Sequence, residues 1–322
     1  MKTSVYKNIS KYPRFLCAGF ALLALQGFAA NPAFADNEQP ATDPVDRIVI
    51  IGNKARIDDV PGSATLLDLE TLQKQSYGDI NRILRAVPGV NLQEEDGFGL
   101  RPNIGLRGTG LDRSSKITLM EDGVLIAPAA YAAPAAYYFP SSGRMAGIEV
   151  VKGASGIKYG PRTQGGSINL ISTPIPKTAS AFGTFKIGDF GSRSAHVWAG
   201  GPIAEPNNGV KISGMLEGFV DRSTGFKQLA NGGDTGFLIQ DMVGKLRFES
   251  ADGARISQSL DLKVQLSDER ANVSYLGLTD ADFASTPFRR YAAAQLDQIN
   301  AKHSELSARY RADLGAGFDL TV

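Results

Sequence analysis

Apolar positions follow a helical spacing near the start of a compact region that begins at Pro61. Two segments, residues 68–75 and 78–87, read as helices, and the second places Ile80, Ile83, Leu84 and Val87 on one face. A Pro-Gly pair at residues 88–89 is a typical end for such a helix. We therefore predict two short helices with one buried stripe ahead of the strands that follow.

From Arg101 to Ser172 the pattern changes to short apolar strands separated by glycine turns. Charged residues stand inside these strands, and a strand interior rarely carries Arg, Glu or Lys unless a partner neutralises the charge. We expect this segment to sit inside another structure. A loop over residues 126–140, rich in Ala, Tyr and Pro, interrupts it, and exposed aromatic side chains on so long a loop favour binding or burial by a partner.

Beyond Pro174-Ile175-Pro176, which reads as a domain boundary, the apolar residues alternate with polar ones in longer segments. Segments of about ten residues with this period of two are typical of a transmembrane β-barrel with apolar residues outward. A soluble β-sandwich produces a similar pattern, so the alternation alone leaves both open. The predicted strands cover residues 182–187, 194–200, 210–221, 236–248, 255–266, 304–311 and 317–322, with a long interruption at 267–300.

The first 35 residues have the pattern of an export signal. A positively charged start is followed by an apolar run over residues 15–28 and by the cleavage pattern Ala33-Phe34-Ala35. A membrane anchor is the alternative, but the run is shorter than the ~20 residues that a spanning helix needs.

A polar, proline-containing leader (36–45) precedes one short β-prone run. The run is an ordinary first strand or a peptide that adds to the sheet edge of another protein, and spacing alone does not decide between the two. Its residues are Asp46, Arg47, Ile48, Val49, Ile50, Ile51 and Gly52.

Composition narrows the function classes. The 322 residues carry a net charge of +1, which gives no basic footprint for nucleic acid. One cysteine and two histidines cannot build a disulfide framework or a Cys/His metal site, so we predict no resident metal or cofactor. Neither a nucleophile elbow nor a phosphate loop is present, and the paired carboxylates read as solvated loop charges, so we predict that the protein is not an enzyme.

The order of parts resembles the N-terminal portion of a TonB-dependent outer-membrane receptor. The motifs that carry the resemblance are Asn103 to Gly108, Leu119 to Gly123, Ile148 to Gly153 and Tyr159 to Pro161. Within the family, residues 101–108 and the loop at 275–291 are similar to the ferric dicitrate transporter group. The implied organisation is a signal peptide (1–35), a periplasmic leader with the TonB box (36–60), a plug domain (61–176) and the first barrel strands (177–322).

The resemblance implies an α+β plug domain followed by the antiparallel transmembrane strands of a 22-stranded barrel. It also implies that residues 46–52 are the TonB box and bind TonB by strand addition, energised by ExbB and ExbD. The protein would then import an iron chelate, such as ferric citrate or a siderophore, across the Gram-negative outer membrane. Iron would travel as part of the bound chelate.

Residue roles follow from the family and from charge. Ferric citrate-type ligands are anionic, so cations at the plug apex would hold them by charge-assisted hydrogen bonds, with polar and aromatic neighbours. A second set of charges in the recurring motifs would latch the plug to the barrel wall, namely Arg107, Glu149 and Lys152. The ligand-binding candidates are Arg101, Arg113, Lys116, Tyr131, Tyr137, Arg162 and Gln164.

Other functions remain alternatives. A receptor of this family could take a non-iron ligand, such as haem, cobalamin, a nickel chelate or an oligosaccharide. A passive porin would not carry over a hundred residues ahead of its first strand, and a secreted β-rich enzyme or adhesin would need a catalytic cluster or repeats. Only about five or six full strands fit after residue 180, and 22 strands of ~9–11 residues cannot be made from residues 177–322, so we also expect the chain to be a fragment.

Overall fold

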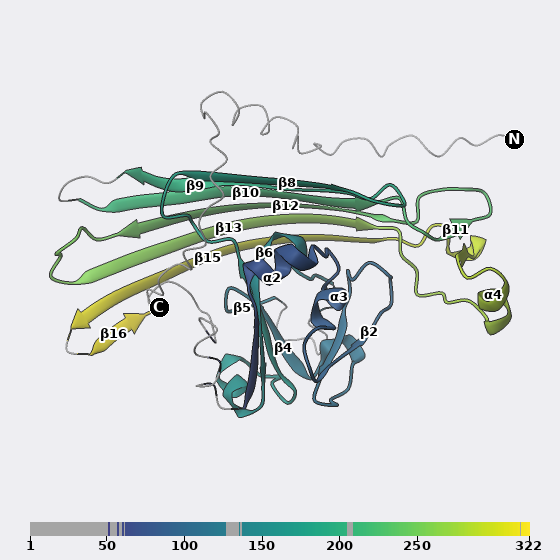
Figure 1. The fold of residues 1–322 in the computed structure, drawn as a ribbon, viewed down its shortest axis with the longest axis horizontal. Coiled ribbons are helices and arrows are strands. Elements are labelled where there is room, and N and C mark those ends of the chain that lie inside the picture. The colour runs from purple at the N-terminus through teal and green to yellow at the C-terminus, as the bar shows by residue number, and fades with distance from the viewer. Residues whose placement is uncertain are drawn as a thin grey trace, which may run out of the picture. The chain divides into compact units, whose positions relative to one another are not determined.

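The computed structural model describes Ile51, Ile57, Val60, 62–126, Ala135, 137–204, 209–315 and 317–322, except the side chains at 154, 155 and 158. These residues belong to one compact unit, Thr42–Val322, which holds a small α+β domain and a sheet of long strands (Figure 1). The predicted signal peptide and residues 46–50 and 52 of the predicted TonB box lie outside the described residues.

The small domain is built on a five-stranded sheet with strand order β1-β6-β7-β4-β5. The pairs β1–β6, β6–β7 and β4–β5 are antiparallel, whereas β4 and β7 are parallel. A separate hairpin joins β2 to β3. The strands are β1 (Ser63–Leu67), β2 (Val90–Gln93), β3 (Asn103–Leu106), β4 (Ile117–Glu121), β5 (Val124–Leu125), β6 (Met145–Lys152) and β7 (Gly166–Ser172).

Both predicted helices are present, and a carboxylate caps each of them. Asp68 accepts a hydrogen bond from the Thr71 N–H ahead of α2 (Leu69–Gln75), and Asp79 accepts one from Asn81 ahead of α3 (Ile80–Leu84). The second helix ends three residues earlier than predicted, because the next N–H groups turn to carbonyls three residues back. Among the described residues, no helix is both long enough and apolar enough to cross a membrane.

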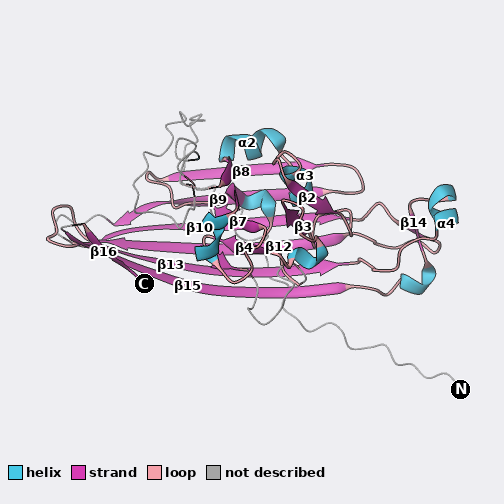
Figure 2. Ribbon diagram, turned by 90° about the horizontal axis from the view of Figure 1, so that it is seen from below, coloured by secondary structure: helices cyan, strands magenta, loops and turns pink. Residues whose placement is uncertain are grey.

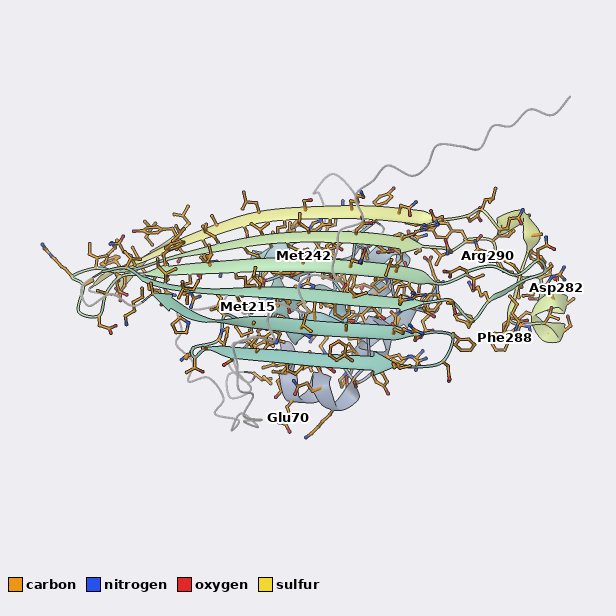
Figure 3. All side chains as sticks on the ribbon, turned by 90° about the horizontal axis from the view of Figure 1, so that it is seen from above. Glu70, Met215, Met242, Asp282, Phe288 and Arg290 are labelled. Carbon is orange, nitrogen blue, oxygen red and sulfur yellow. The ribbon has the colours of Figure 1, made fainter. Side chains whose placement is uncertain are left out.

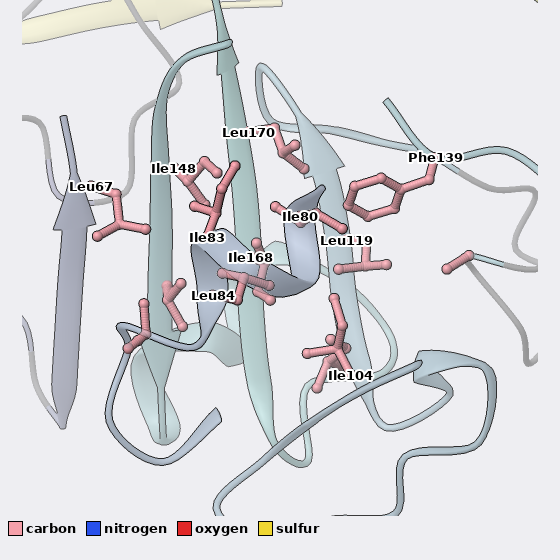
Figure 4. Close-up of a cluster of buried hydrophobic side chains, with 14 of the residues drawn as sticks. Leu67, Ile80, Ile83, Leu84, Ile104, Leu119, Phe139, Ile148, Ile168 and Leu170 are labelled. Atoms are coloured by element: carbon pink, nitrogen blue, oxygen red, sulfur yellow. The ribbon is translucent and has the colours of Figure 1, made fainter. Parts of the chain in front are cut away.

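The helices supply one side of the core of the small domain (Figure 4). Ile80, Ile83 and Leu84 of α3 are at most 2% exposed and belong to one buried cluster with Ile148 and Ile168 of the sheet. Because side chains alternate along a strand, the residues between these positions face the other side of the sheet. That opposite face therefore carries the polar positions of β6 and β7.

Strands of the second sheet are long and antiparallel to their neighbours, in the order β16-β15-β13-β12-β10-β9-β8. All seven segments predicted beyond residue 177 form strands of this sheet. The fold-class prediction, an α+β domain followed by antiparallel strands, is confirmed. The strands are β8 (Ser180–Ile187), β9 (Arg193–Ala204), β10 (Lys211–Ser223), β12 (Phe237–Glu249), β13 (Ser257–Ala271), β15 (Ile299–Gly315) and β16 (Phe318–Thr321).

The two faces of this sheet differ as the alternation predicted. On β10, Leu216 is 58% exposed while its neighbours Met215 and Glu217 are buried. On β13, Val264 and Leu266 are likewise exposed and Lys263 and Gln265 are buried. Lys263 and Gln265 bond to Glu121 of the small domain, so the polar side chains point toward that domain and the apolar ones point away from it. Figure 2 shows the small domain over one face of the long strands.

Long connections gather at one end of the strands. Residues 272–298 hold α4 (Asp280–Ser285), β14 (Arg289–Arg290) and the 3₁₀ turn η5 (Ala292–Ala294). β14 pairs in parallel with β11 (Gln228–Leu229) in the loop between β10 and β12. Figure 3 shows Asp282, Phe288 and Arg290 beyond the same ends of the strands. Further 3₁₀ turns in the small domain are η2 (Asp112–Ser114), η3 (Ser142–Arg144) and η4 (Ala154–Tyr159).

Truncation of the α3 stripe tests the core. Leu84 is fully buried, so Leu84→Ala should remove about 2–5 kcal/mol from the stability of the small domain. Leu69 on α2 is 48% exposed, and Leu69→Ala should change it by less than about 0.5 kcal/mol. Hydrogen exchange of β6 and β7 across a urea series measures both changes. Equal losses in the two variants would contradict the assignment of this core.

Candidate functional site

One arginine joins the small domain to the long-stranded sheet. Arg144, at the end of η3, is completely buried and donates two parallel hydrogen bonds to Glu121, Nη1 to Oε1 at 2.9 Å and Nη2 to Oε2 at 2.8 Å. Its Nε donates to Asp241 Oδ2 of β12 at 3.0 Å. A buried guanidinium is tolerated only when carboxylates pair with it, so the two parts of the chain share one charge network.

The turn that follows β4 supplies the second set of contacts. Asp122 and Gly123 both have a positive φ, the geometry of a tight hairpin turn, and this places the Asp122 carboxylate at the sheet. Lys263 of β13 reaches Asp122 Oδ2 at 2.9 Å and Glu121 Oε1 at 2.8 Å. Lys245 of β12 donates to Ser172 Oγ at 2.5 Å and to the Thr173 carbonyl at 2.6 Å. Two lysines of the sheet thereby hold four polar groups of the small domain.

A histidine and a glutamate continue this contact at the end of β7. Glu217 of β10 accepts hydrogen bonds from the Thr173 hydroxyl at 2.6 Å and lies 2.7 Å from His196 Nε2 of β9. Next to them the small domain approaches the sheet closely, because a Cβ on Gly143 would lie 2.8 Å from the Phe219 ring. Glycine is therefore required at residue 143 for the present spacing.

Electrostatics keep the Glu121 and Asp122 carboxylates charged. Burial alone would raise the pKa of Glu121, but the positive charges of Arg144 and Lys263 outweigh it and hold the pKa below its usual value. Burial also opposes the charge on Asp122, and Lys245 and Lys263 hold its pKa well below the usual range. The contact between the two parts therefore consists of ionised pairs.

A second arginine, Arg101, pairs with Glu269 of β13 at 2.7 Å and is 4% exposed. The loop before it is shaped by Asp96, whose carboxylate accepts hydrogen bonds from the backbone N–H groups of Phe98, Gly99 and Arg101. The structure therefore places the Arg101 guanidinium in a buried ion pair, and its contact with a ligand stays a prediction.

Arg113 has the geometry expected of a ligand-binding cation. Its φ of 50° and that of Ser114, 55°, are strained for side chains other than glycine. The Asn103 side chain holds this turn by accepting from Arg113 N at 2.9 Å. The guanidinium meets Glu95 at 2.6 Å and lies 5.1 Å from the Tyr275 ring centroid in the loop of residues 272–298. A half-exposed cation thus stands where the small domain meets that loop.

Aromatic side chains tie the same region together. Phe98 of the small domain packs on Phe226 and Phe237, with ring centroids 5.4 and 4.9 Å away. Phe226 also contacts Phe190 and Phe288 at 6.3 Å each. The loop that carries Glu95 and Asp96 is therefore held by the connections at the end of the sheet.

The other ligand-binding candidates differ in exposure. Lys116 and Gln164 are exposed, Arg162 is half-buried, and Tyr137 is 63% exposed. Tyr131 lies outside the described residues. The neighbour of Tyr137, Tyr138, stacks on His303 at 3.9 Å and accepts a hydrogen bond from Gln265 at 2.7 Å, so this segment is fixed to β13 and β15. The structure brings none of these candidates into a described contact with Arg113.

The predicted latch residues have other contacts. Glu149 accepts from Ile51 N and from Asn169 Nδ2, and Lys152 donates to the Pro88 carbonyl, all within the small domain. Arg107 is exposed, with a positive φ. The role of these three residues as a latch stays a prediction. Contacts that join the small domain to the long-stranded sheet include those of Arg101, Glu121, Asp122, Arg144, Ser172, Thr173 and Tyr138.

Sequence reasoning missed Glu121, Asp122 and Arg144 as anchors. Glu121 and Asp122 lie in the quoted motif 119–123, but no role was predicted for them. The sequence does contain a signal for them in the long strands. Lys245 and Lys263 lie on the polar face of two predicted strands, and a buried lysine needs an acidic partner. Among the described residues, no cluster of three or more His, Cys, Asp or Glu side chains could hold a metal ion.

A protein-family model described as "TonB-dependent Receptor Plug Domain" matches residues 56–167. These residues are a TonB-dependent receptor plug. The predicted resemblance to this family is confirmed for the plug, and the long-stranded sheet has the fold expected beside it.

Solved receptors share the arrangement of plug and strands. The unliganded ferric citrate transporter FecA superposes with a TM-score of 0.66 at 20% identity, covering 84% of this chain and 40% of FecA. The ferric yersiniabactin uptake receptor FyuA from Yersinia pestis gives a TM-score of 0.59 at 19% identity, with 81% and 40% covered. At these identities the likeness shows the fold alone.

Two relatives with curated names are more similar to this chain in sequence than the solved structures are, but their alignments cover less of it. Two proteins named vitamin B12 transporter BtuB, from two strains of Vibrio vulnificus, are 25% identical over 175 residues and 28% identical over 216 residues. They cover 53% and 64% of this chain. The chain spans 28% and 33% of their own lengths.

Acid should release the plug from the strands. Because the folded-state pKa of Glu121 is lowered, its ion pairs contribute fully above the unfolded value of ~4.3, and this contribution is lost as the pH falls through the lower folded pKa. Protease protection of the plug, measured between pH 7 and pH 2.5, should therefore decrease below pH ~4. Glu121→Gln should weaken protection already at pH 7 and reduce the acid response. An unchanged acid response in this variant would contradict the role of Glu121.

Proposed function

We propose that this chain is the plug and the first barrel strands of an outer-membrane receptor that imports an iron chelate, energised by TonB. The plug domain and the fold support the receptor class. The geometry at Arg113 supports the substrate class. Activity, substrate and partners are proposals because the chain spans only part of the length of its relatives.

Arg113 is the observation that carries the substrate proposal. Its guanidinium is 28% exposed, stands on a strained turn and already binds one carboxylate, that of Glu95. A carboxylate-rich ferric chelate presents the same oxygen atoms and can replace Glu95 as the partner. Tyr275 offers an aromatic surface beside it. Lys116, Arg162, Gln164 and Tyr137 are further candidates for the same ligand.

Energy would enter through the N-terminal segment. Residues 46–52 would pair with TonB by strand addition, and ExbB and ExbD would energise TonB. Ile51, the described residue of this segment, is 2% exposed and donates its N–H to Glu149 inside the plug. A pull on the segment would therefore act directly on the central strands of the plug.

The apolar face of the long strands supports a place in the outer membrane. Leu216, Met242, Leu246, Val264 and Leu266 are each at least 40% exposed on the side away from the plug. Exposed apolar side chains on successive strands would be covered by lipid. The export signal at residues 1–35 would deliver the protein there.

Cobalamin is the second candidate ligand, because the two curated relatives are named as vitamin B12 transporters. A ferric chelate and cobalamin should differ in how strongly their binding depends on the charge of Arg113. A polycarboxylate chelate depends on the guanidinium, whereas a ligand without that anionic surface does not. Equilibrium binding of ferric citrate and of cyanocobalamin to the purified receptor separates them.

Deletion of residues 46–52 tests the energised mechanism. Uptake of ⁵⁵Fe-labelled citrate by cells that express the intact receptor should fall to the level of cells without the receptor. Binding of the chelate to the cell surface should be retained, because Ile51, the described residue of the segment, bonds to Glu149 and the deletion leaves Arg113 in place. Energy-dependent uptake at the normal rate after the deletion would exclude the proposal.

Removal of the Arg113 charge tests the ligand site. Arg113→Ala should weaken binding of ferric citrate about 10- to 100-fold, the effect of losing a charge-assisted hydrogen bond. Arg82→Ala is the matched control, because Arg82 is an exposed arginine on α3. Titration calorimetry on both variants gives the comparison, and equal affinities in the two would remove Arg113 from the site.

A further inference from the structure

A buried polar pair lies in the middle of the plug sheet. Glu149 of β6 and Asn169 of β7 are directly opposite each other in the antiparallel register, and both are 0% exposed. Their neighbours on the opposite face of the sheet, Ile148 and Ile168, belong to the apolar core. Burial of a carboxylate and an amide at this position is unfavourable unless hydrogen bonds satisfy them.

The carboxylate of Glu149 is bound from two directions. Ile51 donates its backbone N–H to Oε1 at 2.8 Å, and Asn169 Nδ2 donates to Oε2 at 3.0 Å. Ile51 belongs to the segment proposed to bind TonB. One buried side chain therefore connects that segment to the second central strand of the plug.

Asn169 extends the connection in the other direction. Its Oδ1 accepts a hydrogen bond from Gly123 N at 2.9 Å, in the turn after β4. An amide can donate on one side and accept on the other, which a carboxylate or an apolar side chain cannot do. The preceding residue, Asp122, pairs with Lys263 of the long-stranded sheet at 2.9 Å.

We propose that Glu149 and Asn169 are positioning residues that couple the TonB-binding segment to the ion pairs between plug and strands, through Ile51, Glu149, Asn169, the Asp122-Gly123 turn and Lys263. We call these residues the relay. The proposal rests on the proposed function only in the role of the segment that contains Ile51. For Glu149 it assigns a function other than the latch predicted from the motifs.

The direction of the coupling follows from the cost of a buried charge. When the segment moves and Ile51 leaves, Glu149 Oε1 loses a donor in a place without solvent, and the pair with Asn169 becomes less favourable. The hydrogen bond from Gly123 N to Asn169 then weakens. Because the same turn positions Asp122, its ion pair with Lys263 weakens as well. By linkage the reverse also holds, so loss of the Lys263 contact should loosen Ile51.

Backbone hydrogen exchange at Ile51 tests the relay in the intact receptor in lipid nanodiscs, without TonB and without ligand. Asn169→Leu removes the central link and leaves Ile51 and Lys263, the two ends of the relay, unsubstituted. Exchange at Ile51 should become about 10- to 100-fold faster. Thr118→Val is the control: Thr118 is 3% exposed on the adjacent strand, and its hydroxyl has no partner among the described residues. No acceleration in Asn169→Leu, or the same acceleration in the control, would overturn the proposal.

A second comparison separates coupling along the relay from general loosening of the plug. Lys263→Met removes the ion pairs of Lys263 with Asp122 and with Glu121, and Asp241→Asn removes the ion pair of Asp241 with Arg144, so only the first variant changes a contact of Asp122. Lys263→Met should accelerate exchange at Ile51 several-fold more than Asp241→Asn does. In an Asn169→Leu background it should add little. Equal effects of the two variants, or full additivity with Asn169→Leu, would show that the relay carries no coupling.

Failure of the proposed function gives a different result. If residues 46–52 do not bind TonB, a TonB fragment leaves exchange at Ile51 unchanged in the unmodified receptor, while the variant effects remain. If the relay is wrong, TonB binding is seen and the variant effects are not.

Discussion

The structure depends on the requirement that buried charges have partners. Arg144 is completely buried, and its partners come from two different elements, Glu121 of the plug and Asp241 of the long-stranded sheet. Removal of either carboxylate would leave a charge that the interior cannot solvate. The same holds for Arg101 with Glu269 and for Lys263 with Asp122. Glu121 is therefore compatible with its short apolar strand because Arg144 and Lys263, the latter from the second sheet, provide the opposite charges.

The plug sheet separates stability from function by its two faces. The face that holds Ile148 and Ile168 packs on α3 and forms an apolar core without help from the rest of the chain. The other face places Glu149 and Asn169 at the centre, where hydrogen bonds have direction and a lost donor raises the free energy sharply. A packed core responds little to a small displacement at one edge. A line of buried hydrogen bonds responds at each link, so the polar face is better suited to receive a pull at the N-terminal segment.

Patterns of local period were sufficient to predict the elements, because strand and helix periods depend on neighbouring residues alone. The seven long strands follow from their alternation, and α3 from one apolar stripe closed by an aspartate cap. The contacts of individual charged residues could not be predicted in the same way. Arg101 and Arg113 look equivalent in the sequence, and their difference comes from Glu269, which lies 168 residues from Arg101 and reaches it through the register of β13. Register and partner choice between distant strands leave no trace in local spacing.

One loop connects the proposed ligand site at Arg113 to the buried ion pairs between plug and strands. Glu95 pairs with Arg113, the adjacent Asp96 holds the backbone of Gly99 and Arg101, and Phe98 lies between them in the aromatic cluster. A ligand that replaces Glu95 at Arg113 would release the end of this loop next to the aspartate that shapes it. Asp96 orients the backbone of Arg101, and Arg101 pairs with Glu269 of the long-stranded sheet. Binding of a ligand at Arg113 and the strength of the Arg101–Glu269 ion pair would therefore depend on the same short segment. A receptor built in this way can alter how firmly its plug is held without moving the plug core.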